Sequence, residues 1–182
     1  MDNHLKFYIN GEWVDPLGSE TIEVINPSDE SVIGSITAGT KEDIDIAVAA
    51  AKKAFKTFGF SSKEERIELL ENIISEYEKR SEELAQTISQ EMGAPLWLSN
   101  VAQVTSGLSH FKDTLEVLKT FEFEGAENNY LVRKEPIGII GMITPWNWPM
   151  NQMCKSCLSN CIRMHHGIKT KRNNSFLWNC IC

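Results

Sequence analysis

Short apolar runs separated by turn residues open the chain and predict two β-hairpins. Residues 6–13 place Asn10-Gly11 between two strand-like runs, and Asn-Gly readily adopts the positive φ values of a tight hairpin turn. Extended stretches at residues 21–25 and 31–36 flank the sequence Asn-Pro-Ser-Asp, where proline cannot donate a ladder hydrogen bond and aspartate favours a turn. We therefore expect two hairpins before residue 40.

Residues 40–120 predict four amphipathic helices. Thr40 is followed three residues later by Asp43, and Ser62 by Glu65, which is the spacing of helix N-terminal caps. The apolar faces of the first, second and fourth helices recur at helical spacing. They are Ile44, Ala47, Val48, Ala51 and Phe55; Ile67, Leu70, Ile73, Ile74 and Tyr77; and Val101, Val104, Leu108, Phe111, Leu115 and Leu118.

Glycine and proline mark the boundary between the third and fourth helices. Gly93 suits the C-terminal cap of a helix over residues 81–91, and Pro95 suits the first turn of a long helix over residues 96–120. Residues 121–134 then alternate charged and apolar positions, which indicates an extended pair around residues 125–129.

Residues 136–144 are uncharged and rich in isoleucine, as expected for a strand buried on both faces of a parallel sheet. This strand ends in a turn over residues 145–149, and ligands of open α/β sheets bind at the carboxyl ends of strands. A core strand followed by an ordinary turn has the same pattern, so both interpretations stay open. Gly138 and Gly141 do not form a phosphate-binding G-x-G-x-x-G motif. The predicted fold class is α/β.

Composition places the chain among soluble globular proteins. It has 182 residues, of which 42% are apolar and 24% charged, and its mean hydropathy is -0.25. No apolar run is long enough to span a bilayer, and residues 1–4 lack the features of a secretion signal. We expect a cytoplasmic protein with neither membrane nor nucleic-acid partners.

Charge and cysteine are distributed unevenly along the chain. Residues 1–154 hold all 25 acidic residues and 13 of the 18 basic ones, whereas residues 155–182 hold five basic residues and no acidic one. The five cysteines all lie at or beyond position 154: Cys154, Cys157, Cys161, Cys180 and Cys182. An acidic body therefore meets a basic, cysteine-rich tail at one boundary.

Four stretches of the body resemble the aldehyde dehydrogenase superfamily. They are FYINGEWV, TIEVINPSDESVIG, EMGAP and KEPIGIIGMITPWNWPMNQ, which ends at Gln152. They follow the family's order and extend the resemblance over about residues 6–154. The resemblance implies that residues 1–154 are the N-terminal part of a Rossmann-like NAD(P)-binding domain, with two hairpins, four helices and the first buried parallel strand.

The resemblance also implies a reaction. In this family a cysteine thiolate attacks an aldehyde, the resulting thiohemiacetal passes a hydride to NAD or NADP, and a glutamate activates the water that hydrolyses the thioester. The substrate is thus a small-molecule aldehyde and the product a carboxylic acid. The full-length family forms homo-oligomers through a strand arm, and we do not expect an oligomer of this chain.

Six consecutive residues match the family's site. Asn147 matches the asparagine whose amide stabilises the oxyanion, and a side-chain amide offers two N–H donors without adding charge. The segment that lies along the cofactor is matched by Ile143, Thr144, Pro145 and Trp146, and an aromatic residue at the mouth of the substrate tunnel by Trp148. For Ile143 and Trp148, ordinary core packing stays an equal alternative.

The tail, residues 155–182, departs from the family and contains neither its catalytic cysteine region nor its catalytic glutamate. Cys154, Cys157, Cys161, His165 and His166 have spacing similar to zinc ligands. A zinc site also needs a second well-spaced pair, and Cys180-x-Cys182 at the terminus is poor for that purpose. We expect no metal site here.

The genetic code offers another account of the tail. If suitable codons are read one nucleotide later, Met164-His165 gives Cys, the next two overlaps give Thr and Met, and residues 167–173 give Val-Leu-Lys-Pro-Ser-Glu, as in the family. One extra base in a run of A near Lys155-Ser156 would produce the tail. We expect an out-of-frame, disordered segment on an inactive chain. The alternative is a non-enzymatic fragment or a relic that binds cofactor or a partner.

Overall fold

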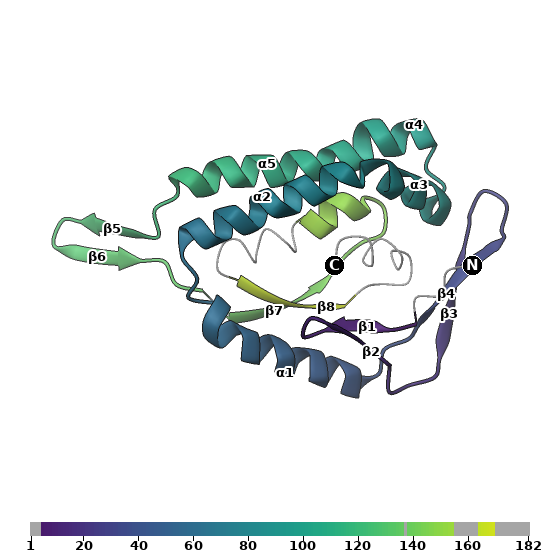
Figure 1. Cartoon of the computed structure of the whole chain (residues 1–182), viewed down its shortest axis with the longest axis horizontal. Coiled ribbons are helices and arrows are strands. Elements are labelled where there is room, and N and C mark those ends of the chain that lie inside the picture. Colours follow the sequence, from purple (N-terminus) through teal and green to yellow (C-terminus); the bar gives the residue numbers. More distant parts are fainter. Residues whose placement is uncertain (1–4, 137, 155–163, 170–182) are drawn as a thin grey trace.

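The computed structural model describes residues 5–136, 138–154 and 164–169. Both predicted hairpins are confirmed (Figure 1). Strand β1 (Phe7–Ile9) pairs antiparallel with β2 (Glu12–Val14), and β3 (Thr21–Ile25) with β4 (Val32–Thr37). The first turn has φ values of 57° at Asn10 and 82° at Gly11, in the left-handed region that Asn-Gly readily enters.

The helices begin where the sequence predicts. Helix α1 (Lys41–Phe58) and helix α2 (Lys63–Lys79) both start with a capping box, and α3 (Ser81–Met92) ends at Gly93, whose φ is 72°. The fourth predicted helix has three parts: α4 (Leu96–Leu98), the π-helical segment η1 (Ser99–Val104) and α5 (Thr105–Thr120). It was expected as one regular helix.

The cap of α1 also joins the helix to the segment after the first hairpin. The carboxylate of Asp43 accepts hydrogen bonds from the backbone N–H of Thr40 at 2.8 Å and of Leu17 at 3.0 Å. These hydrogen bonds lower the pKa of Asp43, because they favour its charged form. A residue that the sequence marks as a local cap therefore also makes a long-range contact.

The π-helical segment corrects the predicted apolar face of the fourth helix. Val104, Phe111, Leu115 and Leu118 are buried as predicted, but Val101 is 70% exposed. Hydrogen bonds from i to i+5 place an extra residue in the turn, which changes the direction of side chains before it relative to those after it. The hydroxyl of Tyr77 donates to the Val104 carbonyl at 2.8 Å, at the end of this segment.

The extended pair predicted within residues 121–134 is a third hairpin. Strand β5 (Glu124–Glu127) pairs antiparallel with β6 (Tyr130–Arg133), and every residue of both strands is exposed. Figure 1 shows this hairpin projecting away from the rest of the molecule.

The parallel strand pair lies between two helical layers. Strand β7 (Gly138–Ile143) pairs in parallel with β8 (Met164–Lys169). In Figure 1 the pair lies between α1 and the layer formed by α2 to α5, and α1 contacts both strands. The predicted α/β class is confirmed.

Two expectations about these strands are wrong. Residues 136–144 were expected to be buried on both faces, yet Ile143 is 77% exposed and Gly141 is also exposed. Within the described residues, β7 has only β8 as a neighbouring strand, so part of its surface stays uncovered. The tail was expected to be irregular, but Met164–Lys169 is a strand because the free edge of β7 offers backbone donors and acceptors. The other residues of the tail lie outside the described part.

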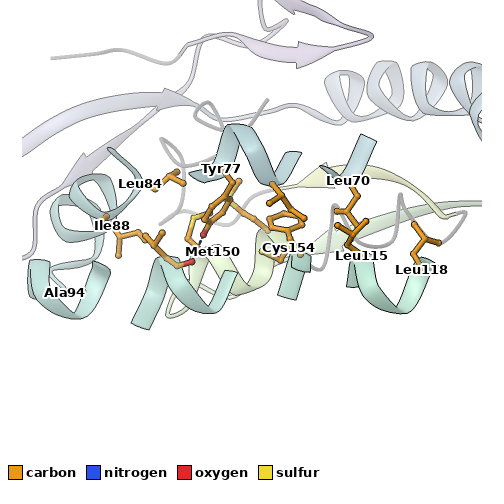
Figure 2. Close-up of a cluster of buried hydrophobic side chains, with 14 residues drawn as sticks. Leu70, Tyr77, Leu84, Ile88, Ala94, Leu115, Leu118, Met150 and Cys154 are labelled. Carbon is orange, nitrogen blue, oxygen red and sulfur yellow. Dashed lines mark hydrogen bonds between the residues drawn. The ribbon is translucent and has the colours of Figure 1, made fainter. Parts of the chain in front are cut away.

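One hydrophobic core joins α2, α3, α5 and a short helix at residues 149–154. Figure 2 shows its side chains meeting between these helices. Its buried members are Leu70, Ile74, Tyr77, Leu84, Ala85, Ile88, Ala94, Val104, Phe111, Leu115, Leu118, Met150, Met153 and Cys154. Across the residues that are described, no helix combines the length and apolar character needed to cross a membrane.

Arg66 is a buried charge that sequence periodicity does not reveal. Its side chain is 0% exposed, and Nη2 donates to the Phe58 carbonyl at 2.7 Å while Nε donates to the Ser61 carbonyl at 3.4 Å. The guanidinium also lies 4.9 Å from the centroid of the Phe58 ring. Arg66 therefore holds the C-terminal end of α1 against the start of α2.

Candidate functional site

The candidate site is the loop that follows β7. The strand ends at Ile143, residues 144–148 form the loop, and the helix at residues 149–154 begins at Pro149. Proline is favoured in the first helical turn because it has no N–H to leave unpaired and its φ is already helical. All six residues that the sequence nominated lie between the end of this strand and the start of this helix, at the carboxyl end of a parallel strand.

The nominated residues differ sharply in burial. Asn147 and Pro145 are exposed, Ile143 is 77% exposed, Trp146 54% and Trp148 37%, whereas Thr144 is only 3% exposed. Core packing, the alternative for Ile143 and Trp148, therefore does not describe Ile143 in this chain. The exposed amide of Asn147 is free to meet a small molecule approaching the loop.

Some of the buried polar atoms without partners among the described residues belong to the loop, to the helix after it, or to Gln103, which contacts the loop. Within the described residues, the hydroxyl of Thr144, Oδ1 of Asn151 and Oε1 of Gln103 are buried and have no hydrogen-bond partner. Buried polar atoms are usually paired, and an exception calls for an explanation such as a ligand or an ordered water. Their position beside exposed Asn147 is consistent with a site that binds a polar molecule.

Gln103, which the sequence did not nominate, contacts the loop directly. Its Nε2 donates to the backbone carbonyl of Asn147 at 3.2 Å, across 44 positions of sequence. Gln103 is 3% exposed and belongs to η1. No short-range pattern could have revealed this contact, because it depends on how the fourth helix packs.

The helix after the loop is anchored on α5. The thiol of buried Cys154 donates to the Gly107 carbonyl at 3.0 Å, and buried Met150 packs beside it. Burial, together with nearby Cys154, raises the pKa of Tyr77 far above its usual range, so its hydroxyl stays protonated as the donor to Val104. These contacts fix the helix and therefore one end of the loop.

Gly107 makes this close approach sterically feasible. A Cβ at residue 107 would lie 2.5 Å from Tyr77 Oη, 3.0 Å from Met150 Cβ and 3.3 Å from Cys154 Sγ. We expect Gly107→Ala to lower the free energy of unfolding by about 1–3 kcal/mol, because the added methyl overpacks the core. Urea unfolding followed by circular dichroism measures the change.

Gly125→Ala is the matched control for that substitution. A Cβ at residue 125 would meet no atom within 4 Å, so the same chemical change should leave stability within about 0.5 kcal/mol. Equal effects of the two substitutions would contradict the close packing at Gly107.

The residues whose spacing is similar to zinc ligands can be placed only in part. Cys154 is buried and bonded to Gly107, while Cys157 and Cys161 lie outside the described residues, as do the side chains of His165 and His166. In the part of the chain that the structure covers, no group of three or more His, Cys, Asp or Glu side chains could hold a metal ion.

Comparison with known proteins identifies the family. The profile of the aldehyde dehydrogenase family matches residues 13–161. A 3-succinoylsemialdehyde-pyridine dehydrogenase from a Pseudomonas species is 44% identical over 154 residues, which cover 84% of this chain and 32% of that protein. The chain therefore belongs to the aldehyde dehydrogenase family.

Solved structures agree with this assignment. An aldehyde dehydrogenase from Bartonella henselae superimposes with a TM-score of 0.94 at 38% identity, over 99% of this chain and 39% of that one. A mutant of aldehyde dehydrogenase C from Pseudomonas syringae, crystallised with NAD+ and octanal, also gives a TM-score of 0.94, at 34% identity and over 97% of this chain and 37% of that one. The chain thus corresponds to the N-terminal part of this fold and spans about a third of its relatives' length.

Proposed function

We propose that this sequence belongs to an enzyme that oxidises an aldehyde to a carboxylic acid with NAD or NADP, and that the activity resides in a longer product. The observation that carries the proposal is the exposed amide of Asn147 at the carboxyl end of β7, with its backbone held by Gln103. The family assignment supplies the reaction class.

Asn147 would act on the oxygen of the aldehyde. When a cysteine thiolate of the longer product adds to the carbonyl carbon, negative charge develops on this oxygen, and the Nδ2–H groups of Asn147 donate to it. An amide suits the task because it adds no charge that would pair with the thiolate. A glutamate of the longer product would activate the water for the final hydrolysis.

The segment from Ile143 to Trp146 would lie along the nicotinamide cofactor. Its composition fits such a group, because the buried Thr144 hydroxyl has no partner among the described residues while Ile143 and Trp146 expose apolar surface. The cofactor, when bound, accepts the hydride. Trp148, which is 37% exposed, would line the approach of the aldehyde.

We further propose that residues 155–182 come from a shifted reading frame and that residues 1–154 form the part of the domain that matches the family. With suitable codons, the one-nucleotide shift can encode Cys-Thr-Met-Val-Leu-Lys over the residues that form β8. An apolar sequence of this kind suits a parallel strand better than Met-His-His-Gly-Ile-Lys does. The 182-residue chain itself would oxidise no aldehyde.

A second proposal is that the 182-residue chain is made as it stands and binds a cofactor or a partner without catalysis. The apolar surface of Ile143, 77% exposed, and Trp146, 54% exposed, favours this alternative. It predicts binding of NAD+ with no turnover.

Two measurements together test both proposals. The first is sequencing of the gene across codons 154–157 and through the stop codon, and the second is an assay of reduced NAD(P) formation from aldehydes. If the extra base is absent, the longer product should form reduced NAD(P) from aldehydes. If the base is present, the 182-residue chain should form none, and NAD+ titration followed by tryptophan fluorescence then tests binding. Aldehyde-dependent reduction of NAD+ by the 182-residue chain would overturn the proposed inactivity.

A further inference from the structure

We propose that Gln103 is a positioning residue that fixes the direction of the Asn147 amide. The inference rests on the proposed function only for the meaning of Asn147 as an oxyanion donor. The contact itself is a hydrogen bond of 3.2 Å from Gln103 Nε2 to the Asn147 carbonyl. Because a carbonyl can only accept, the amide nitrogen of Gln103 must face the loop.

The burial of Gln103 argues that this hydrogen bond has a purpose beyond packing. The side chain is 3% exposed, and its Oε1 has no partner among the residues described. Burying an unsatisfied amide oxygen is unfavourable, so an apolar side chain of similar volume would pack there at lower cost. The polar side chain is accounted for by the hydrogen bond that it donates to Asn147.

The surroundings of Gln103 make it a rigid donor. Its own carbonyl accepts a hydrogen bond from the Ser106 hydroxyl at 3.0 Å, and the next carbonyl, that of Val104, accepts from Tyr77 at 2.8 Å. The π-helical turn places Gln103 inward while Val101 stays exposed. The backbone that carries the donor is therefore held on both sides.

The hydrogen bond acts at the middle of the loop, between two ends that are already fixed. One end continues from β7, and the other enters the helix at residues 149–154, which is anchored through Cys154 on Gly107. Without Gln103, the peptide unit of Asn147 could rotate between these ends. Its side-chain amide would then sample several directions, whereas a donor needs one defined direction to meet a developing charge.

Fluorine NMR of the 182-residue chain labelled with 5-fluorotryptophan tests this inference. Trp146 and Trp148 flank Asn147, and Trp13 in β2 serves as a distant reference. Gln103→Met keeps the side-chain volume but removes the donor. We expect this substitution to shift and broaden the Trp146 and Trp148 resonances and to leave that of Trp13 unchanged.

Ser99→Ala is the matched control. Ser99 is also buried in η1, and its hydroxyl has no hydrogen-bond partner among the described residues. It should therefore move neither loop resonance. Unchanged Trp146 and Trp148 resonances in Gln103→Met would overturn the inference, as would equal changes in both variants.

A measurement on the unsubstituted chain decides the matter if Gln103→Met does not fold. One side-chain amide proton of Gln103 should exchange with solvent slower, by on the order of tenfold, than those of exposed Gln86. Equal exchange rates would overturn the inference. Neither readout needs enzymatic activity, so failure of the proposed function would be seen separately, as absence of turnover by the longer product.

Discussion

Phe111→Ala is expected to lower the free energy of unfolding of the 182-residue chain by about 3–5 kcal/mol. The Phe111 ring is 0% exposed and meets the Tyr77 ring edge-on, with centroids 5.7 Å apart. Truncation removes the buried ring and leaves a cavity between α5 and α2 that the surrounding helices can close only in part. Since small domains have about 5–15 kcal/mol in total, this loss is a large fraction of their stability.

Denaturant unfolding followed by circular dichroism measures this change, and Phe60→Ala is its control. Phe60 is 73% exposed, although its ring lies 6.3 Å from that of Phe55. The same truncation there should therefore cost less than about 1 kcal/mol. Similar losses at the two positions would contradict a core centred on Phe111.

The turns and helix caps are the parts of the fold that could be predicted from the sequence. These features depend on residues that are at most three positions apart, so they were predicted correctly. They are the turn at Asn10-Gly11 and the capping boxes of Thr40 with Asp43 and of Ser62 with Glu65. Hairpins and helix starts are local choices of the backbone, and sequence patterns report them directly.

The errors occur where long-range contacts decide the structure. Val101 has helical spacing with the buried face, but the π-helical turn leaves it exposed, and no residue type marks such a turn in advance. Arg66 was not recognised as buried because it donates to backbone carbonyls at and just after the end of another helix. The sequence shows that a residue can carry charge, but not which carbonyls will surround it.

The candidate site shows the same division. Asn147 could be nominated because it matches a family motif in a turn after a strand. Gln103 and Gly107 could not be nominated, because their importance arises from contacts with residues more than 40 positions away. Motifs indicate the residues that meet a substrate, while packing determines which residues hold them.

Asn147→Ala is expected to reduce kcat of the longer product by about 100- to 1,000-fold, which corresponds to loss of one well-aimed oxyanion donor. The longer product is the one read in the proposed restored frame, expressed from the gene itself if the extra base is absent, or after deletion of one base at codons 155–156 if it is present. The KM for the aldehyde should change little, because the hydrogen bond strengthens only as charge develops on the oxygen. Steady-state formation of reduced NAD(P) gives both constants.

Asn100→Ala provides the comparison for this substitution. Asn100 is exposed on η1, and its side chain donates to the Leu96 carbonyl of the same helix at 3.0 Å. Its replacement should leave kcat within about twofold, since surface substitutions away from a site have small effects. If Asn147→Ala instead lowered stability while kcat of the folded enzyme stayed unchanged, Asn147 would be a turn former and the oxyanion role would be wrong. A loss of kcat at unchanged stability is the result expected when a donor aimed at the reacting oxygen is removed.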